Sequence, residues 1–173
     1  MWQLLKYLNF SIRLPIKSLR KLCYTFNMKK YENLFWETKQ LHELTNEEWE
    51  ALCDGCGLCC LHKLQDEEID DAPILMTRVV CRCYDLQSAG CSDYPNRQKL
   101  VPECTALTVK RASEFDWLPP TCAYRLRHHN LPIPLWHPLI SGTRNSVRPY
   151  SVHALNPVLE TETIDLEDYL IPN

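Results

Sequence analysis

Four cysteines occur within eight residues in the run Cys53-Asp54-Gly55-Cys56-Gly57-Leu58-Cys59-Cys60. A hydrophobic core does not need this density of thiols, but a metal site does, because a C-x-x-C step curls the backbone so that two thiolates reach one ion. The glycines between the cysteines tolerate the positive φ that such turns adopt. Repeating the step gives C-x-x-C-x-x-C, a spacing typical of iron–sulfur proteins. We therefore expect a metal site around which the rest of the chain is organised.

Cys60 directly follows Cys59 in this run. Neighbouring side chains in an extended segment point to opposite faces. We therefore expect these two thiols to serve different metals, or one metal and one other partner, more easily than the same ion.

Disulfide bridges are the alternative to metal ligation, since the chain has ten cysteines in 173 residues. In a secreted chain that density would indicate a bridged scaffold. The first residues, however, mix basic and apolar side chains and contain no uninterrupted apolar stretch or small-residue cleavage site typical of a signal peptide. The expected compartment is therefore the reducing cytoplasm, where closely spaced thiols are more often metal ligands.

The composition, with 45% hydrophobic and 24% charged residues, is typical of a soluble globular chain with one modest core. No stretch approaches the roughly 20 apolar residues of a membrane span. Only four glycines accompany twelve prolines, which favours fixed turns and short elements. The predicted fold class is α+β: a small, irregular single domain of short helices and a short β-hairpin, organised around a cysteine cluster.

The charge is distributed unevenly. Residues 1–30 contain seven basic and no acidic residues, so the overall charge of −3 leaves −10 for residues 31–173. The acidic body argues against nucleic-acid binding, which needs clustered Lys and Arg. We assign residues 1–30 as a basic amphipathic extension and residues 31–173 as the cysteine-cluster domain. The extension either contacts an anionic membrane surface, which we do not favour, or packs on the body, or is not translated, because Met28 offers a second start.

Local patterns predict how the cysteines are delivered. Thr45 and Glu48 form a capping-box signature for a short helix that delivers Cys53 into the run. Residues 61–64 and 74–80 are expected to form a hairpin that returns Cys81 beside the run.

Further along the chain, Pro120 is expected to open a helix that runs through Cys122 to His128, with Arg125 and Arg127 exposed. A last short amphipathic helix is expected over residues 164–170.

A family resemblance is carried by residues spread over most of the chain. They are Leu52 to Leu64, Val80-Cys81-Arg82, Cys91 with Tyr94, Pro102 with Cys104, Trp117-Leu118-Pro119, Thr121 to Arg125, Trp136 to Leu139, Ser141-Gly142 and Ser146-Val147-Arg148. In these positions the chain resembles the YcgN-like branch of the YkgJ-type cysteine-cluster family, whose members are described as zinc- or iron-chelating and have no known function. The resemblance spans about Phe35 to Leu170.

The resemblance implies eight metal ligands: Cys53, Cys56, Cys59, Cys60, Cys81, Cys91, Cys104 and Cys122. Eight thiols suffice for two four-thiolate sites, or for one cluster and a separate structural or redox pair. Cys83 and Cys23 fall outside the family pattern and are expected to be bystanders. Cys83 should point away from Cys81 unless a turn breaks the alternation.

Other polar and aromatic residues have competing interpretations. His62 is a metal ligand, a donor to a cluster sulfur, or a surface histidine. For His137 we favour a structural role over a hydrogen bond to a metal ligand. Trp117 and Trp136 are expected to be core anchors. Arg125 and Arg148 pair with carboxylates or neutralise a thiolate site.

Three function classes remain. The first is a cytoplasmic metal-binding protein, with iron–sulfur favoured over zinc. The second is an iron–sulfur metalloenzyme for redox or group-transfer chemistry, since flagellin lysine methylases carry a similar cysteine signature. The third is a redox-sensing or interaction module with reversible disulfides. The sequence contains no P-loop, dinucleotide fingerprint or other catalytic motif, so it assigns no catalytic residue, and it indicates no particular protein partner.

Overall fold

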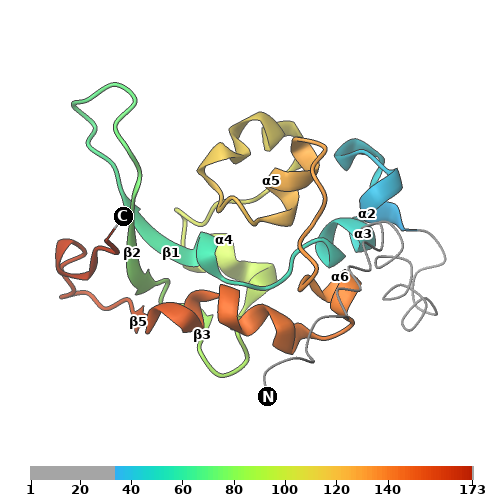
Figure 1. Cartoon of the computed structure of the whole chain (residues 1–173). Helices are drawn as coiled ribbons and strands as arrows, with labels where there is room; N and C mark the ends of the chain where they lie inside the picture. The colour runs from blue at the N-terminus through green and yellow to red at the C-terminus, as the bar shows by residue number, and fades with distance from the viewer. Residues whose placement is uncertain (1–33, 173) are drawn as a thin grey trace, which may run out of the picture. The chain divides into compact units, whose positions relative to one another are not determined.

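The larger sheet of residues 34–172 is built on an antiparallel hairpin, in which β1 (Leu61–Leu64) pairs with β2 (Leu75–Val80), as Figure 1 shows. The register pairs Leu61 with Val80, and a bulge follows before Lys63 pairs with Met76. Leu61 and Val80 are buried with Tyr84 and Val152 in one apolar cluster. The predicted hairpin is therefore confirmed, and its open end, at Leu61 and Val80, lies next to the cysteine run.

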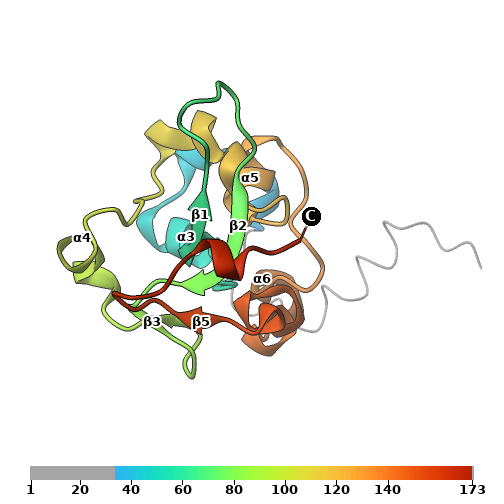
Figure 2. The same ribbon diagram turned by 90° about the vertical axis from the view of Figure 1, so that its left-hand side faces the viewer.

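A short third strand, β5 (Val158–Leu159), lies parallel to β2 and was not predicted. The C-terminal segment then returns to β2, where Leu170 bridges Thr77 and the Ile171 N–H donates to the Met76 carbonyl at 2.8 Å. Figure 2 shows this segment in red running beside β2. The predicted helix over 164–170 is reduced to one 3₁₀ turn, η7 (Glu167–Tyr169), because the residues after it bond to the strand.

The other elements are short, and the irregular α+β prediction is confirmed. The α-helices are α2 (Phe35–Thr38), α3 (Asn46–Ala51), α4 (Arg97–Leu100), α5 (Ala123–His128) and α6 (Pro138–Ser141). The 3₁₀ segments are η1 (Leu41–Glu43), η2 (Leu58–Cys60), η3 (Tyr94–Asn96), η4 (Val109–Trp117), η5 (Arg144–Tyr150) and η6 (Val152–Leu155). Two strands of two residues each, β3 (Tyr84–Asp85) and β4 (Gly90–Cys91), pair as a second antiparallel hairpin.

The capping box at α3 forms as predicted. The Glu48 N–H donates to the Thr45 hydroxyl at 3.2 Å, and the Thr45 N–H donates to the Glu48 carboxylate at 2.9 Å. The helix ends at Leu52, which is fully buried. This anchored end delivers Cys53 to the start of the run.

Two predictions about α5 are wrong. The helix begins at Ala123 with Cys122 as its N-cap, because the Cys122 N–H bonds to the Pro119 carbonyl in a preceding turn. Arg127 is only 8% exposed, since its guanidinium donates to the carbonyls of Leu131 and Lys39. The helix packs against both η1 and η4, so it lacks the solvent face that the sequence pattern indicated.

The structure, a computed structural model, describes residues 34–172. The chain divides between residues 32 and 33. The predicted basic extension and Cys23 lie outside the described residues. Among the helices of residues 34–172, none combines the length and the apolar character that a membrane span requires.

Candidate metal centre

The first half of the run is an irregular loop built on two left-handed glycines. Gly55 has φ 76° and Gly57 has φ 72°. The Asp54 carboxylate oxygen Oδ1 accepts the Cys56 N–H at 2.9 Å, and the Cys56 carbonyl accepts the Val152 N–H at 2.9 Å. The loop is therefore held both locally and by a segment almost a hundred residues away.

The second half of the run is helical, which changes the relation between its last two thiols. Cys59 and Cys60 belong to η2, and their sulfur atoms lie 4.0 Å apart. The expectation that these side chains diverge to opposite faces is wrong, because it assumed an extended backbone. Sulfurs bound tetrahedrally to one zinc at about 2.3 Å lie about 3.8 Å from each other. The pair therefore has the separation of two ligands on one ion.

A cavity of about 400 Å³ opens beside the run. Seven cysteines line it: Cys53, Cys59, Cys60, Cys81, Cys83, Cys91 and Cys104. Its walls include the aromatic side chains of Trp49, Tyr84, Tyr94, Trp117 and Tyr124. None of the nine described cysteines forms a disulfide. The fold thus gathers thiols from four separate segments around one space.

The hairpin and the turn after it bring three of these thiols in. The Cys81 N–H donates to the Cys60 carbonyl at 3.0 Å, as the predicted return of β2 requires. The Tyr84 N–H then bonds to the Cys81 carbonyl at 2.8 Å, which closes a turn over residues 81–84. That turn breaks the strand alternation and places Cys83 on the cavity too. Tyr84 of β3 pairs with Cys91 of β4, and this pairing brings Cys91 to the cavity as well.

Cys83 therefore does not point away from the cavity, contrary to the expectation for a bystander. Cys104 enters from the loop after α4, where its N–H donates to the Val101 carbonyl. Cys56 and Cys122 do not line the cavity. Cys122 nevertheless lies close enough to the run to interact with the charges of Cys59 and Asp54. Burial first, and then these two negative charges, raise the pKa of Cys122 to about 11.

Most of the thiols are held in the neutral form. Burial is the main cause that raises the pKa of Cys53 to about 12 and raises that of Cys56 further. Cys53 is an exposed residue, and it lines the cavity. A metal must displace protons from such thiols, so its uptake depends on pH.

Cys59 is the exception within the run. The hydrogen bond from the Cys60 thiol, followed by the positive charge of Lys63, lowers the pKa of Cys59 to about 7, and the same bond raises that of Cys60. The Lys63 ammonium donates to the carbonyls of Cys59 and Leu61 and lies 5.1 Å from the Trp117 ring centre. Cys59 is therefore the thiol of the run that ionises most readily.

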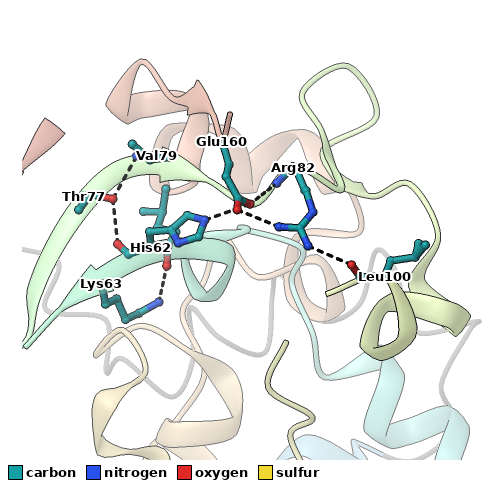
Figure 3. A network of polar contacts seen from close by, with 8 residues as sticks. His62, Lys63, Thr77, Val79, Arg82, Leu100 and Glu160 are labelled. Carbon is teal, nitrogen blue, oxygen red and sulfur yellow. Dashed lines mark hydrogen bonds and ion pairs between the residues drawn. The ribbon is translucent and has the colours of Figure 1, made fainter. Parts of the chain in front are cut away.

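The partly buried carboxylate of Glu160 ties the Cys81–Tyr84 turn to the end of β5, as Figure 3 shows. Glu160 accepts the Arg82 backbone N–H and one guanidinium nitrogen, both at 2.9 Å, and lies 3.2 Å from His62 Nε2. Arg82 also donates to the Leu100 carbonyl, close to α4. Burial alone would raise the pKa of Glu160, but the Arg82 N–H, His62 and the Arg82 charge together hold it below its ordinary value. The roles weighed for His62 did not include this carboxylate contact, and the His62 side chain also lines the cavity.

His137 is the structural histidine that we favoured. It is fully buried, its Nδ1 accepts the Leu139 N–H, and its Nε2 lies 3.1 Å from the Leu52 carbonyl. Because Nδ1 accepts, Nε2 carries the proton and donates. The residue before Cys53 is thereby fixed.

The expectation of core positions for Trp117 and Trp136 is wrong. Trp117 is partly buried and lines the cavity, while Trp136 stacks on the half-exposed Tyr150 ring with centroids 4.5 Å apart. Arg125 pairs with Asp116 at 3.5 Å, as one of its two interpretations expected.

Sequence reasoning missed two further polar groups. Asp54 is 7% exposed and its oxygen Oδ2 has no hydrogen-bond partner within residues 34–172. The Tyr84 hydroxyl, on the cavity, has none in that part of the chain either. Burial first, and then the charges of four cysteines, raise the pKa of Tyr84, so it remains a neutral donor. Asp54 stands inside the run, but no sequence pattern shows that a polar residue is buried.

These groups fit a thiolate-bound metal: the donor set is rich in soft sulfur, and the cysteine run carries a buried carboxylate oxygen without a donor. Within residues 34–172, no three His, Cys, Asp or Glu side chains already converge in an arrangement that could hold an ion. The thiols share the cavity rather than a single coordination point.

Comparison with known proteins supports the metal-binding character. A family model described as "CxxCxxCC: Putative zinc- or iron-chelating domain" matches residues 52–123. The chain is 49% identical to a UPF0260 protein of Pseudomonas fluorescens strain Pf0-1 over 140 residues, 79% of this chain and 93% of the relative. This chain belongs to the UPF0260 family. A UPF0260 protein of Rhizorhabdus wittichii is 51% identical over 138 residues, with the same two coverages.

A third UPF0260 relative, from Granulibacter bethesdensis, is 48% identical over 138 residues, which are 79% of this chain and 82% of the relative. No solved structure matches the chain. The nine described cysteines all fall within the segment matched by the family model, 52–123. The matched segment thus supplies every cysteine that lines the cavity.

Proposed function

We propose that this UPF0260 chain is a metal-binding protein that holds an iron–sulfur cluster or zinc through its cysteine cluster, in the manner of the YcgN-like branch of the YkgJ-type proteins. The ligand set is Cys53, Cys56, Cys59, Cys60, Cys81, Cys91, Cys104 and Cys122. One observation carries the proposal: six of these eight thiols line a single cavity, together with Cys83.

Iron–sulfur is the favoured occupant because C-x-x-C-x-x-C spacing is typical of cluster binding. Zinc is the competing occupant, since two zinc ions would use all eight thiolates and zinc often occupies closed all-cysteine sites. When bound, a cluster would supply electron transfer and zinc would supply folding free energy. The thiolate at Cys59 and the neutral donor at Tyr84 would serve either.

The test is purification without oxygen, followed by analysis of metal, acid-labile sulfide and optical absorption. We expect brown protein whose broad absorption bleaches in air. Colourless protein with stoichiometric zinc and no sulfide would overturn the preference for iron. Protein that takes up neither metal, with thiols that cycle through disulfides, would instead support a redox module.

The ligand set is tested by serine substitutions under the same conditions. Cys53→Ser and Cys104→Ser should each lower the metal content per chain. Cys83→Ser is the matched control, because Cys83 lines the same cavity but lies outside the ligand set. Equal losses for all three variants would show that Cys83 is a ligand as well.

A metalloenzyme is the second candidate, and the cavity favours it. Its volume of about 400 Å³ and its aromatic walls fall within the range of small-molecule sites, about 300–1,000 Å³. An enzyme would need an open coordination position beside this space. Azide added to the iron-loaded protein should then shift its absorption or paramagnetic resonance spectrum. An unchanged spectrum would indicate a closed site and a binding protein.

We further propose that the chain works in the cytoplasm and that residues 31–173 are the metal-binding domain. The first proposal is supported by nine thiols without disulfides, which suit a reducing compartment. The second is supported by the division of the chain at residues 32 and 33. A chain shortened to begin at Met28 should bind as much metal per molecule as the full chain. Reduced stoichiometry would show that residues 1–27 contribute to the site.

A further inference from the structure

The Asp54 carboxylate is buried without a positive partner. Asp54 is 7% exposed, and none of the ion pairs within residues 34–172 includes its carboxylate. Oδ1 is used by the Cys56 N–H, whereas Oδ2 has no hydrogen-bond donor in this part of the chain. Buried carboxylates in folded proteins are paired, hydrogen-bonded or bound to metals, because the loss of hydration is otherwise uncompensated.

Two basic side chains close to the run are bonded to backbone groups. The Lys63 ammonium donates to two backbone carbonyls, and both nitrogens of His137 are bonded to backbone groups. Arg144 approaches the neighbouring Gly55 but forms no ion pair with Asp54. The charge that Asp54 needs is therefore not supplied by a described side chain.

Asp54 belongs to the cysteine run, directly after Cys53 and two residues before Cys56. Its Oδ1 accepts the Cys56 N–H at 2.9 Å, so the buried carboxylate is folded back onto the loop that carries these two thiols. A divalent cation bound by thiolates of this loop would supply the missing partner of Oδ2, because it attracts the carboxylate and the thiolates alike.

We propose that Asp54 Oδ2 is an oxygen ligand of a metal ion held by thiolates of the cysteine run. This inference rests on the proposed function and narrows it: the centre has a mixed sulfur and oxygen ligand set rather than a closed set of thiolates. Zinc and iron(II) both accept carboxylate and thiolate together. A carboxylate ligand is also more easily exchanged than a fourth thiolate.

The test compares two substitutions in the full chain, with Zn²⁺ alone as the probe under reducing, oxygen-free conditions. Asp54→Asn keeps the acceptor for the Cys56 N–H but replaces Oδ2 with a group that cannot bind a cation. Asp54→Cys loses that acceptor but restores an ionisable ligand. In competition with a chromophoric chelator, we expect Asp54→Asn to lower the affinity for zinc at least tenfold. The Asp54→Cys protein should bind zinc more tightly than the Asp54→Asn protein.

Co²⁺ provides a second readout, since Asp54→Cys should increase the sulfur-to-cobalt charge-transfer absorption relative to wild type. Asp66→Asn is the matched control, because Asp66 accepts the Glu68 N–H at 2.9 Å in the same type of turn but is exposed. It should bind zinc as wild type does. If Asp54 only shapes the turn, Asn will match wild type and Cys will be the weaker variant, which overturns the inference. Wild-type protein that binds no metal at all would instead overturn the proposed function.

Discussion

At the scale of single residues, Gly57 shows how tightly the loop of the run is built. Its φ is 72°, and a Cβ on it would lie 2.6 Å from the Tyr84 hydroxyl oxygen. A side chain is thus opposed both by the left-handed backbone and by a buried ring on the cavity wall.

We predict that Gly57→Ala destabilises the protein by about 2 kcal/mol or more, from backbone strain of about 1–3 kcal/mol and displacement of Tyr84. Gly90→Ala is the control, since nothing lies within 4 Å of a Cβ at Gly90. Urea unfolding of both variants at equal metal loading measures the difference. Equal losses of stability would show that the Tyr84 contact is unimportant.

His137 predicts a dependence of stability on pH. Burial lowers the pKa of His137 below its ordinary value of 6.5, although the Leu52 carbonyl and Asp54 act in the opposite direction. Below about pH 6.5 the unfolded chain therefore binds more protons at this residue than the folded chain, and the free energy of unfolding falls as the pH is lowered.

Protonation of His137 should lower the free energy of unfolding by at most about 1.4 kcal/mol per pH unit. His137→Gln should reduce the decline in unfolding free energy between pH 7 and pH 5.5, relative to wild type at the same metal loading. His42→Gln, at an exposed position, is the control and should leave the decline unchanged. Parallel curves for wild type and His137→Gln would contradict the assignment.

At the scale of elements, β5 matters because of the residue that follows it. Glu160 bonds the turn after β2 to the edge of the sheet and thereby fixes the approach of Cys81 and Cys83 to the cavity. The side chain of Glu160 is 18% exposed and that of Arg82 is 49% exposed, so solvent screens their ion pair and the hydrogen bonds carry most of its value.

We predict that Glu160→Ala lowers stability by about 1–2 kcal/mol, because the charge-assisted bonds from Arg82 lose their acceptor. Amide exchange at Arg82 should become faster, since its N–H donates directly to Glu160. Glu162→Ala is the control at an exposed position nearby. Unchanged exchange across residues 81–84 would show that the turn does not depend on this carboxylate.

At the scale of the whole molecule, the region between Cys53 and Cys122 has few regular elements, and the largest regular one is a hairpin of four and six residues. Its fully buried apolar side chains are also few. Metal binding supplies folding free energy where a core is thin.

We predict that chelation under reducing conditions loosens residues 53–122 while α3 persists, because its capping box does not involve a thiol. Limited proteolysis should then cut within residues 53–122 and spare residues 45–51. An unchanged digestion pattern after complete metal removal would contradict this. Restoring the original pattern by adding the metal back is the control.

The sequence by itself determined the features that depend on neighbours in the chain. The thiol spacing of the run indicated metal binding, the Thr45–Glu48 signature gave the capped helix, and β-branched apolar residues gave the second strand of the hairpin. Each rests on interactions within a few residues, so periodicity and spacing suffice to predict it.

Only the tertiary structure decided which side chains are buried and which thiols meet. Val152 bonds to Cys56, Glu160 bonds to Arg82, and α5 is covered on two sides, which buries Arg127. These contacts join segments tens of residues apart, and no local pattern encodes them. The turn after Cys81 and the 3₁₀ geometry at Cys59 and Cys60 likewise reversed expectations that assumed extended backbone. The burial of Asp54 arises in the same way, because desolvation depends on every segment packed around a residue and not on the residues beside it in the chain.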